Sequence, residues 1–356
     1  MSQIRVRLNG LFSLFAFGVI VSAIGGCVEK PTAVGNGGSG VPTSQAKSSL
    51  TLLNVSYDPT RELWKELNKA FIPQFEKETG QSLTIDQSHG GSSSQARVII
   101  DGLPADVATL SIWTDTDALR KQGLLKEKWE DTFENRSLPY TSTVVFVVRK
   151  GNPKGIKEWS DVVKPGVSVI TPNPKTSGNG RLSFLGAWGN VVLNGGSEAD
   201  AVEFIKKLYG NAPNLDAGAR GATMTFAQKG IGDVHLTMES EAYLEVKEAK
   251  GELEIVYPKL SILHEPHVAV VDKVVDKKGT RAAAEAYLKF LYTKEGQEII
   301  AKHYFRPTDA EVAEKVAGRF QPIKLFLITD IVPSWDEAQA KFFADGGVFD
   351  QVYDKK

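Results

Sequence analysis

The sequence predicts an α/β protein with largely parallel sheets, divided into two lobes. Short apolar segments typical of buried strands alternate along the chain with segments in which apolar residues recur at helical spacing. Such alternation is typical of parallel sheets covered by helices. The chain has 356 residues, of which 42% are hydrophobic and 24% charged, so it can bury a full core and is long for one domain.

Each predicted element has its own signal. Asp58-Pro59 is a helix start, because Asp caps helices and Pro fits the first turn, and apolar residues then recur at helical spacing up to Gly80. The segment 92–95 matches a capping box that opens a second helix. Further helices are expected after residue 176, over 219–230 and over 282–292, and strands at 50–55, 83–86, 107–110, 140–148, 167–170, 232–238 and 268–275.

The N-terminal residues have the pattern of an export signal. A start with two arginines precedes an apolar run over residues 11–24, and Ile24-Gly25-Gly26-Cys27 follows, which is similar to a bacterial lipobox. Cys27 is the only cysteine, so no intrachain disulfide is possible. We expect a lipoprotein signal peptide over residues 1–26 and a lipid on Cys27. An ordinary signal peptide and an uncleaved membrane anchor are the alternatives.

A tether follows the leader. Residues 28–49 are rich in Gly, Ser, Pro and Thr and contain no periodic apolar pattern, which is typical of a flexible linker. We expect a tether over residues 27–49 and a folded part that begins at about Leu50.

The charge balance argues against a nucleic-acid-binding protein. The chain carries 42 Lys and Arg against 43 Asp and Glu, and without Arg5 and Arg7 of the leader 40 basic residues oppose 43 acidic ones. A net charge near −3 lacks the basic footprint that a phosphate backbone requires. We therefore expect no nucleic acid among the partners.

Five helix starts, most of them preceded by an apolar strand, are suited to surround one small anion. Helix starts leave backbone N–H groups free and carry a partial positive charge, which is what an oxyanion needs. In α/β sheets, ligands lie beyond the carboxyl ends of the strands, where these segments fall. A single start is most simply a cap, so the prediction depends on their combination. The segments are 56–60, 88–94, 176–180, 218–221 and 238–241.

Four longer motifs include most of these starts. They are LNVSYDPTREL at 53–63, QSHGGS at 87–92, PNPKTSG at 172–178 and DAGARG at 216–221. In this order they resemble the sulfate-binding proteins of bacterial ABC importers, and the resemblance runs from about residue 50 to residue 353. It implies a type II periplasmic-binding-protein fold, in which two lobes joined by a hinge close around an anion.

The resemblance also implies which residues bind the anion. The family's donors correspond to the backbone N–H groups of Asp58, Ser92, Gly178, Asn179 and Ala219 and to the hydroxyl of Ser177. A tryptophan donor of the family corresponds to Met238, which cannot donate a hydrogen bond. This departure leaves sulfate and thiosulfate both open, and Met238 either faces the ligand or packs in the core behind it.

Asp58 and Arg220 each allow two interpretations. A site made only of donors accepts sulfate and rejects hydrogen phosphate, whose proton needs an acceptor. We expect the Asp58 carboxylate to cap its helix and to point away from the ligand; as an acceptor it would favour phosphate. Arg220 either supports the anion indirectly, by steadying the 88–94 loop, or is an ordinary surface arginine.

The sequence contains no convincing catalytic or metal-binding motif. Pro266 between His264 and His267 forbids the helical spacing of a zinc motif, and Ser177 has no His or Asp motif around it. We therefore expect no metal, no cofactor and no enzyme activity. A surface-anchored hydrolase of phosphate or sulfate esters is the alternative from a different class.

The expected function is capture of sulfate or thiosulfate for ATP-driven import. We expect a lipid-anchored monomer, periplasmic or at the cell surface, that delivers the anion to an ABC permease and its ATPase. Phosphate or molybdate is the alternative ligand. Lobe one is expected over 50–139 plus 263–356 and lobe two over 140–262, with hinge strands near 141–146 and 265–270.

Overall fold

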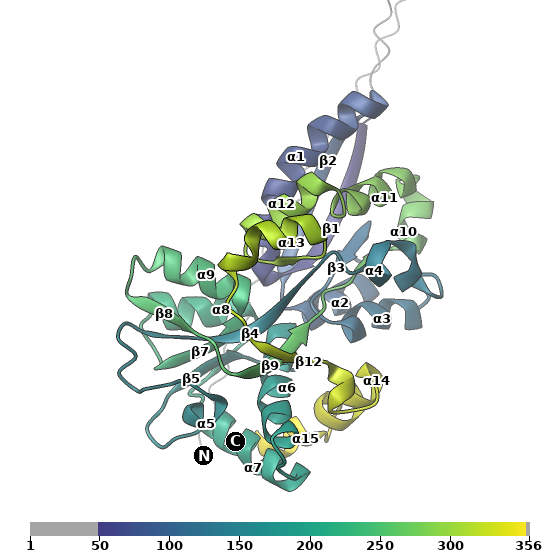
Figure 1. Cartoon of the computed structure of the whole chain (residues 1–356). Coiled ribbons are helices and arrows are strands. Elements are labelled where there is room, and N and C mark those ends of the chain that lie inside the picture. Colours follow the sequence, from purple (N-terminus) through teal and green to yellow (C-terminus); the bar gives the residue numbers. More distant parts are fainter. Residues whose placement is uncertain (1–48, 354–356) are drawn as a thin grey trace, which may run out of the picture. The chain divides into compact units, whose positions relative to one another are not determined.

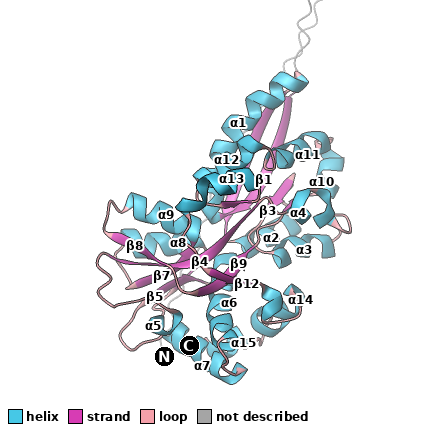
Figure 2. Ribbon diagram, in the orientation of Figure 1, coloured by secondary structure: helices cyan, strands magenta, loops and turns pink. Residues whose placement is uncertain are grey.

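The computed structural model describes residues 49–353 (Figure 1). The predicted signal peptide, Cys27 and the tether up to residue 48 lie outside these residues. Within the described range, no helix is both long and apolar enough to cross a membrane. Two sheets are covered by helices (Figure 2), so the predicted α/β class is confirmed.

The first sheet has four strands. In spatial order they are β10 (Val268–Val270), β3 (Val107–Thr109), β1 (Ser49–Tyr57) and β2 (Ser82–Gly90). As predicted for most of this sheet, β1 is parallel to β2 and β3, whereas β10 is antiparallel to β3. The helices associated with it are α1 (Arg61–Thr79), α2 (Ser92–Ile100), α3 (Trp113–Lys121), α4 (Glu134–Ser137), α10 (Asp272–Lys278), α11 (Arg281–Phe290), α12 (Lys294–Lys302) and α13 (Ala310–Val316).

Helices cover both faces of the first sheet. Because successive residues of a strand face opposite sides, Leu52 and Val55 of β1 enter different cores. Leu52 packs in one cluster with Trp64 of α1 and Tyr287 of α11, whereas Val55 packs in another with Ile99 of α2. The sheet is therefore buried on both sides.

The second sheet has eight strands and is mixed. They are β4 (Tyr140–Arg149), β5 (Val169–Pro172), β6 (Leu215–Asp216), β7 (Val234–Met238), β8 (Leu253–Val256), β9 (Leu260–His264), β11 (Arg306–Pro307) and β12 (Lys324–Phe326). β4 is antiparallel to β7, β8, β9 and β11, so the expected parallel arrangement is wrong for this strand. β5 is parallel to β6 and β7, as predicted.

The second sheet also carries a core on each face. Phe146 of β4 packs edge-on against Trp159 on one face, with ring centroids 4.9 Å apart, whereas Val145 and Val147 pack with Phe226 on the other. The helices associated with this sheet are α5 (Trp159–Val162), α6 (Gly178–Leu193), α7 (Glu198–Gly210), α8 (Ala219–Thr223), α9 (Glu239–Glu248), α14 (Trp335–Ala338) and α15 (Val348–Val352).

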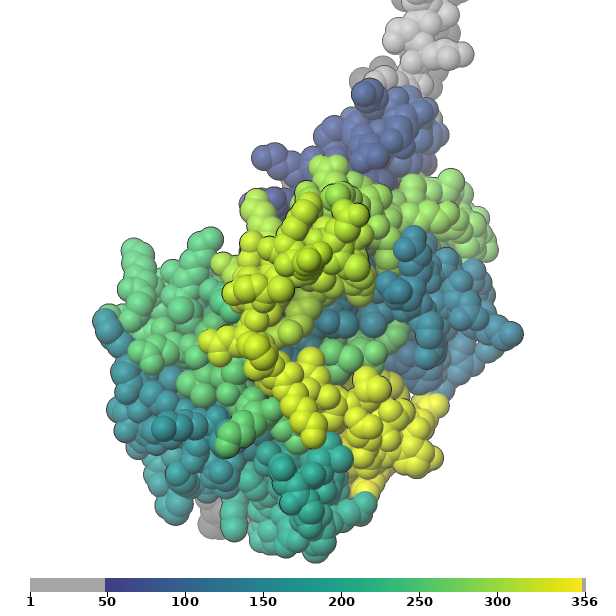
Figure 3. Space-filling view, in the orientation of Figure 1, coloured from purple at the N-terminus to yellow at the C-terminus, as the bar shows by residue number. Residues whose placement is uncertain are grey.

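The C-terminal segment packs with the second sheet, which corrects its assignment to lobe one. β12 pairs with β9 in parallel, and Phe342 lies 4.8 Å from Trp188 of α6, measured between ring centroids. Phe349 makes a similar contact with Tyr209 of α7 at 5.1 Å. Figure 3 shows this segment in yellow beside the teal helices of the second sheet. Residues 324–353 therefore share a core with the part predicted as lobe two.

The chain passes between the cores of the two sheets three times. β4 begins with Tyr140 in the core beside α1 and continues to Phe146 in the core of the second sheet. The chain returns between Ile262 and Val268, close to the second crossing predicted from the sequence. A third crossing, which the sequence did not predict, leads from Phe305 in the core beside α1 to Phe326 of β12 in the core of the second sheet.

Candidate anion-binding site

A small cavity lies where elements from both sheets meet. Its atom-free space is about 160 Å³, and only about 10 Å³ of it is open to the centre of a water molecule, so it can hold a compact ion but no large organic solute. The cavity is lined by Tyr57, Asp58, Pro59, Gly90, Gly91, Ser92, Ser111, Ser177, Gly178, Asn179 and Ala219. Six of the seven predicted contact residues are among them, and Met238 is the exception.

Four helix starts point their first turns at this cavity. The short helix η1 (Asp58–Thr60) follows β1, α2 follows β2, and α6 and α8 come soon after β5 and β6. The cavity therefore lies beyond the carboxyl ends of four strands, as in other α/β folds. The first N–H groups of each helix have no partner within the helix, so they are available to an anion.

Ser177 is positioned as a hydroxyl donor. It is the N-cap of α6, and its Oγ accepts a hydrogen bond from the N–H of Gly180 at 3.4 Å. Among the described residues, no acceptor receives the Ser177 hydroxyl proton. An anion in the cavity can take that proton without displacing the cap.

Ser92 has a different role from the one its sequence suggests. The predicted capping box is absent, because α2 has Gly91 as its N-cap and no side-chain cap. The Ser92 Oγ instead accepts a hydrogen bond from the N–H of Ser111 at 2.9 Å. This bond ties the start of α2 to the segment after β3, and it explains why Ser111 lines the cavity although the sequence did not single it out.

The Asp58 carboxylate forms an ion pair rather than a helix cap. Its Oδ1 lies 2.7 Å from the guanidinium of Arg61, which also donates to the carbonyl oxygen of His89 at 3.1 Å. No side chain caps η1. The negative charge of Asp58 at the cavity is therefore offset by Arg61 directly behind it.

The histidines near the cavity add no positive charge at neutral pH. Burial lowers the pKa of His264 to about 3, and burial together with the positive charge of Arg61 lowers that of His89 to about 4. The His264 Nε2 lies 2.7 Å from the carbonyl oxygen of Ser111, and the His89 Nδ1 lies 2.5 Å from the Ser56 hydroxyl. The His264 ring therefore holds the backbone at Ser111, the His89 ring holds the Ser56 side chain, and no Lys, Arg or His lines the cavity.

Arg220 is held by two carboxylates. Its guanidinium lies 2.9 Å from Glu62 of α1 and 3.4 Å from the buried Glu241 of α9. Burial raises the pKa of Glu241 to about 7, although Arg220 acts in the opposite direction. No hydrogen bond from Arg220 to the 88–94 loop is found among the described residues, although its positive charge acts on His89 of that loop, so support of the anion through the loop stays a prediction.

Met238 belongs to the core. It is the last residue of β7, is 1% exposed, and pairs with Val144 of β4. Its side chain packs in the same cluster as Leu236. This placement matches the second of the two interpretations, in which Met238 packs behind the site.

The two halves of the cavity are in close contact. A Cβ at Gly91 would lie 2.4 Å from the carbonyl oxygen of Thr176, and a Cβ at Gly178 would lie 2.5 Å from the Cβ of Ser111. Only glycine allows such an approach. The buried ion pair between Arg181 of α6 and Asp115 of α3, at 3.3 Å, spans the same gap. The structure is therefore a closed form.

The chemistry of the site is that of binding. Within residues 49–353, no group of three or more His, Cys, Asp or Glu side chains could hold a metal ion. His264 is bonded to Ser111 and His267 packs edge-on against Trp129, so the two histidines do not converge. Among the described residues Ser177 has no basic partner. Ser111 of the cavity lining lies 3.1 Å from the His264 Nε2, but burial lowers the pKa of that ring to about 3, which makes it a weak base.

Fold and cavity together define a two-lobed solute-binding protein. The chain matches the family described as bacterial extracellular solute-binding protein over residues 64–306. Its fold is the type II periplasmic-binding-protein fold that the resemblance implied.

Individual relatives narrow the class further. The chain is 53% identical to the sulfate-binding protein of Escherichia coli (strain K12) over 87% of this chain and 95% of that protein. It is 52% identical to the thiosulfate-binding protein of Pseudomonas aeruginosa over 86% and 93%, respectively. The solved structure of SubI, the sulfate-binding protein from Mycobacterium tuberculosis H37Rv, is 31% identical with a TM-score of 0.74, covering 82% of this chain and 99% of that chain. The chain belongs to the sulfate- and thiosulfate-binding proteins of this family.

Proposed function

We propose that the cavity binds one sulfate or thiosulfate ion for import. The observation that carries this proposal is that four helix starts meet at a small cavity that no cationic side chain lines. Helix starts share the charge of a desolvated oxyanion as fixed dipoles. The proposed donors are the Ser177 hydroxyl and the N–H groups of Asp58, Ser92, Gly178, Asn179 and Ala219. The ligands in the names of two relatives support the same assignment.

Binding is coupled to closure of two lobes in this proposal. Lobe one comprises residues 50–139 and about 265–323, and lobe two comprises 140–264 and 324–353. These bounds assign each segment to the lobe whose hydrophobic cores it shares, the two cores of the first sheet or the two cores of the second. The hinge strands lie near 141–146 and 265–270, with the β11–β12 connection as a third link. Ligand entry is coupled to opening of the lobes, because residues of both lobes line the cavity.

Sulfate is preferred to hydrogen phosphate because the cavity offers mainly donors. The Asp58 Oδ1 is bound by Arg61 at 2.7 Å, which reduces its capacity to accept a proton from phosphate. An unpaired phosphate proton in an enclosed site costs about 1–3 kcal/mol. Phosphate and molybdate are the alternative ligands.

The cellular role follows from the family and from the leader. The protein acts as the extracytoplasmic component of an ABC importer and passes its anion to a permease driven by an ATPase. It functions as a monomer, periplasmic or at the cell surface, attached through a lipid on Cys27. It performs no covalent chemistry and needs no cofactor.

A calorimetric panel of sulfate, thiosulfate, phosphate and molybdate tests the proposal on the mature protein. Sulfate and thiosulfate should bind with one site per chain, and phosphate should bind at least about tenfold more weakly, since one unpaired proton is the difference. Tighter binding of phosphate or molybdate than of sulfate would assign the cavity to that anion. Recovery of the anion unchanged after incubation distinguishes binding from hydrolysis of an ester.

A further inference from the structure

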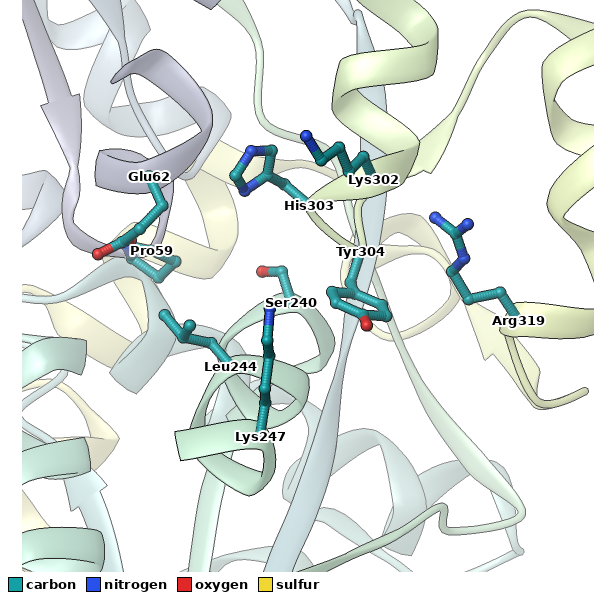
Figure 4. Close-up of a pocket in the computed structure, with 9 residues that line it drawn as sticks. All are labelled: Pro59, Glu62, Ser240, Leu244, Lys247, Lys302, His303, Tyr304 and Arg319. Carbon is teal, nitrogen blue, oxygen red and sulfur yellow. The ribbon is translucent and has the colours of Figure 1, made fainter. Parts of the chain in front are cut away.

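A second hollow, with a volume of about 420 Å³, lies next to the anion cavity (Figure 4). Residues of α9 line it on one side, and the end of α12 with the residues that follow it lines the other. Pro59 lines both this hollow and the anion cavity, so the two spaces are neighbours. A volume of this size is typical of sites for small organic molecules. We call it the α9–α12 hollow.

The α9–α12 hollow combines apolar walls with one unsatisfied polar group. Leu244, Pro59 and Tyr304 supply apolar surface, and the Tyr304 ring is fixed by stacking on Tyr243 at 4.2 Å. Ser240 is 4% exposed, and its Oγ has no hydrogen-bond partner among the described residues. Figure 4 shows the Ser240 side chain on the α9 wall of the hollow. Because buried hydroxyls are normally paired, the Ser240 Oγ lacks a partner that a ligand would supply.

Basic side chains surround the α9–α12 hollow. Lys247 and Arg319 line it from opposite lobes, and neither forms an ion pair with a carboxylate in the described range. Lys302 also lines it and is paired with Glu66 at 2.5 Å. Glu62 is the acidic residue of the lining, and Arg220 binds it at 2.9 Å. The hollow therefore favours a negatively charged ligand.

We propose that the α9–α12 hollow binds a compact organic anion, a sulfonate or carboxylate with an apolar body. The oxyanion accepts hydrogen bonds from the Ser240 hydroxyl and the Lys247 ammonium, and the apolar body lies between Leu244 and Tyr304. The anion cavity is too narrow for such a molecule, because the space open to the centre of a water molecule is about 10 Å³ there and about 420 Å³ in the hollow. The two sites therefore bind different ligands.

A ligand in the α9–α12 hollow should also promote closure. Since both lobes line the hollow, its ligand contacts the closed form better than an open one, and by linkage it raises the affinity of the anion cavity for sulfate. This coupling rests on the proposed function, whereas binding of the organic anion itself does not.

Calorimetric titration of benzenesulfonate into the mature, sulfate-saturated protein tests the site. A parallel titration with benzoate tests whether a carboxylate binds there. At least one of the two should bind with a millimolar Kd, and its saturation should lower the sulfate Kd about threefold or more. Lys247→Ala should weaken its binding about tenfold, and Ser240→Ala should weaken it measurably. Lys277→Ala, at an exposed position on α10, is the matched control and should bind like the wild type.

Four results would refute the proposed site. The first two are that neither anion binds at about 10 mM and that uncharged benzyl alcohol binds as tightly as the anions. The other two are that Lys247→Ala binds the anion with wild-type affinity and that benzenesulfonate displaces sulfate. If the protein fails to bind sulfate at all, the proposed function is refuted. The comparison of wild type with Lys247→Ala still decides the organic-anion site in that case, because it can be made without sulfate.

Discussion

Replacing Gly91 by Ala should block closure of the two lobes without unfolding either of them. A Cβ at this position would lie 2.4 Å from the carbonyl oxygen of Thr176 and 2.8 Å from that of Ala217, both in the other lobe. Ordinary contacts of a Cβ begin at 3.4 Å, so the two backbones would have to separate by about 1 Å, the difference between 3.4 and 2.4 Å. The φ angle of Gly91 is −59°, which alanine adopts without strain.

The expected loss of sulfate affinity follows from the free-energy cost of this clash. Overpacking of a rigid contact costs about 1–3 kcal/mol, which corresponds to about 5- to 150-fold in the affinity for sulfate. Because the clash exists only in the closed form, the Tm of the free protein should not change, whereas the rise in Tm caused by saturating sulfate should be smaller. Calorimetry and thermal unfolding measure the two quantities.

Gly210→Ala is the matched control for this prediction. Gly210 ends α7, and a Cβ there has no neighbour within 4 Å, so the variant should bind sulfate like the wild type. If Gly91→Ala binds sulfate within about twofold of the wild type, the bound state does not have the lobe contact described for the closed form.

Ser177→Ala should weaken sulfate binding by about 1.5–3 kcal/mol, because an enclosed charge-assisted hydrogen bond is lost; an affinity within about twofold of wild type, measured by calorimetry, contradicts this. Sulfate and thiosulfate should bind within about tenfold of each other, and since Met238 packs in the core, Met238→Leu should leave their ratio unchanged in competition titrations. Cys27→Ser should be exported and recovered in the soluble fraction, whereas firm membrane attachment of this variant would indicate an uncleaved leader. Burial raises the pKa of Glu241 from 4.5 to about 7, so the native state binds this proton more tightly than the unfolded state, and the associated stability is complete below pH 4.5 and lost as the pH rises through 7. Glu241→Gln should therefore reduce the difference in free energy of unfolding between about pH 5 and pH 8, as measured with denaturant; an unchanged difference argues that Glu241 is not the titrating group.

Local signals located most of the candidate site. A helix start after an apolar strand is readable from a few neighbouring residues, and Asp58, Ser92, Ser177 and Ala219 all line the cavity at such starts. Ser111 was missed because nothing in its own segment marks it. Its position depends on bonds to Ser92 and to His264, which lies 153 residues further along the chain.

Side-chain partners were predicted less well than backbone positions. The Asp58 carboxylate was expected to cap its helix, yet it pairs with Arg61. Arg220 was left open between support of the 88–94 loop and an ordinary surface position, and neither interpretation included its bonds to Glu62, 158 positions away in sequence, and to the buried Glu241. A long charged side chain can reach several partners, so its choice depends on which carboxylates the fold places within a few ångströms.

By itself the sequence determined the α/β class, the leader pattern, the order of most strands and helices and the helix starts that face the anion cavity. These features depend on residues close together in the chain, through hydrophobic periodicity, capping and turn propensity. Only the tertiary structure decided that β4 runs antiparallel within the second sheet and that residues 324–353 return to it. Strand pairing and the edge-on contact of Phe342 with Trp188 join distant segments, and such contacts leave no periodic trace in either segment alone.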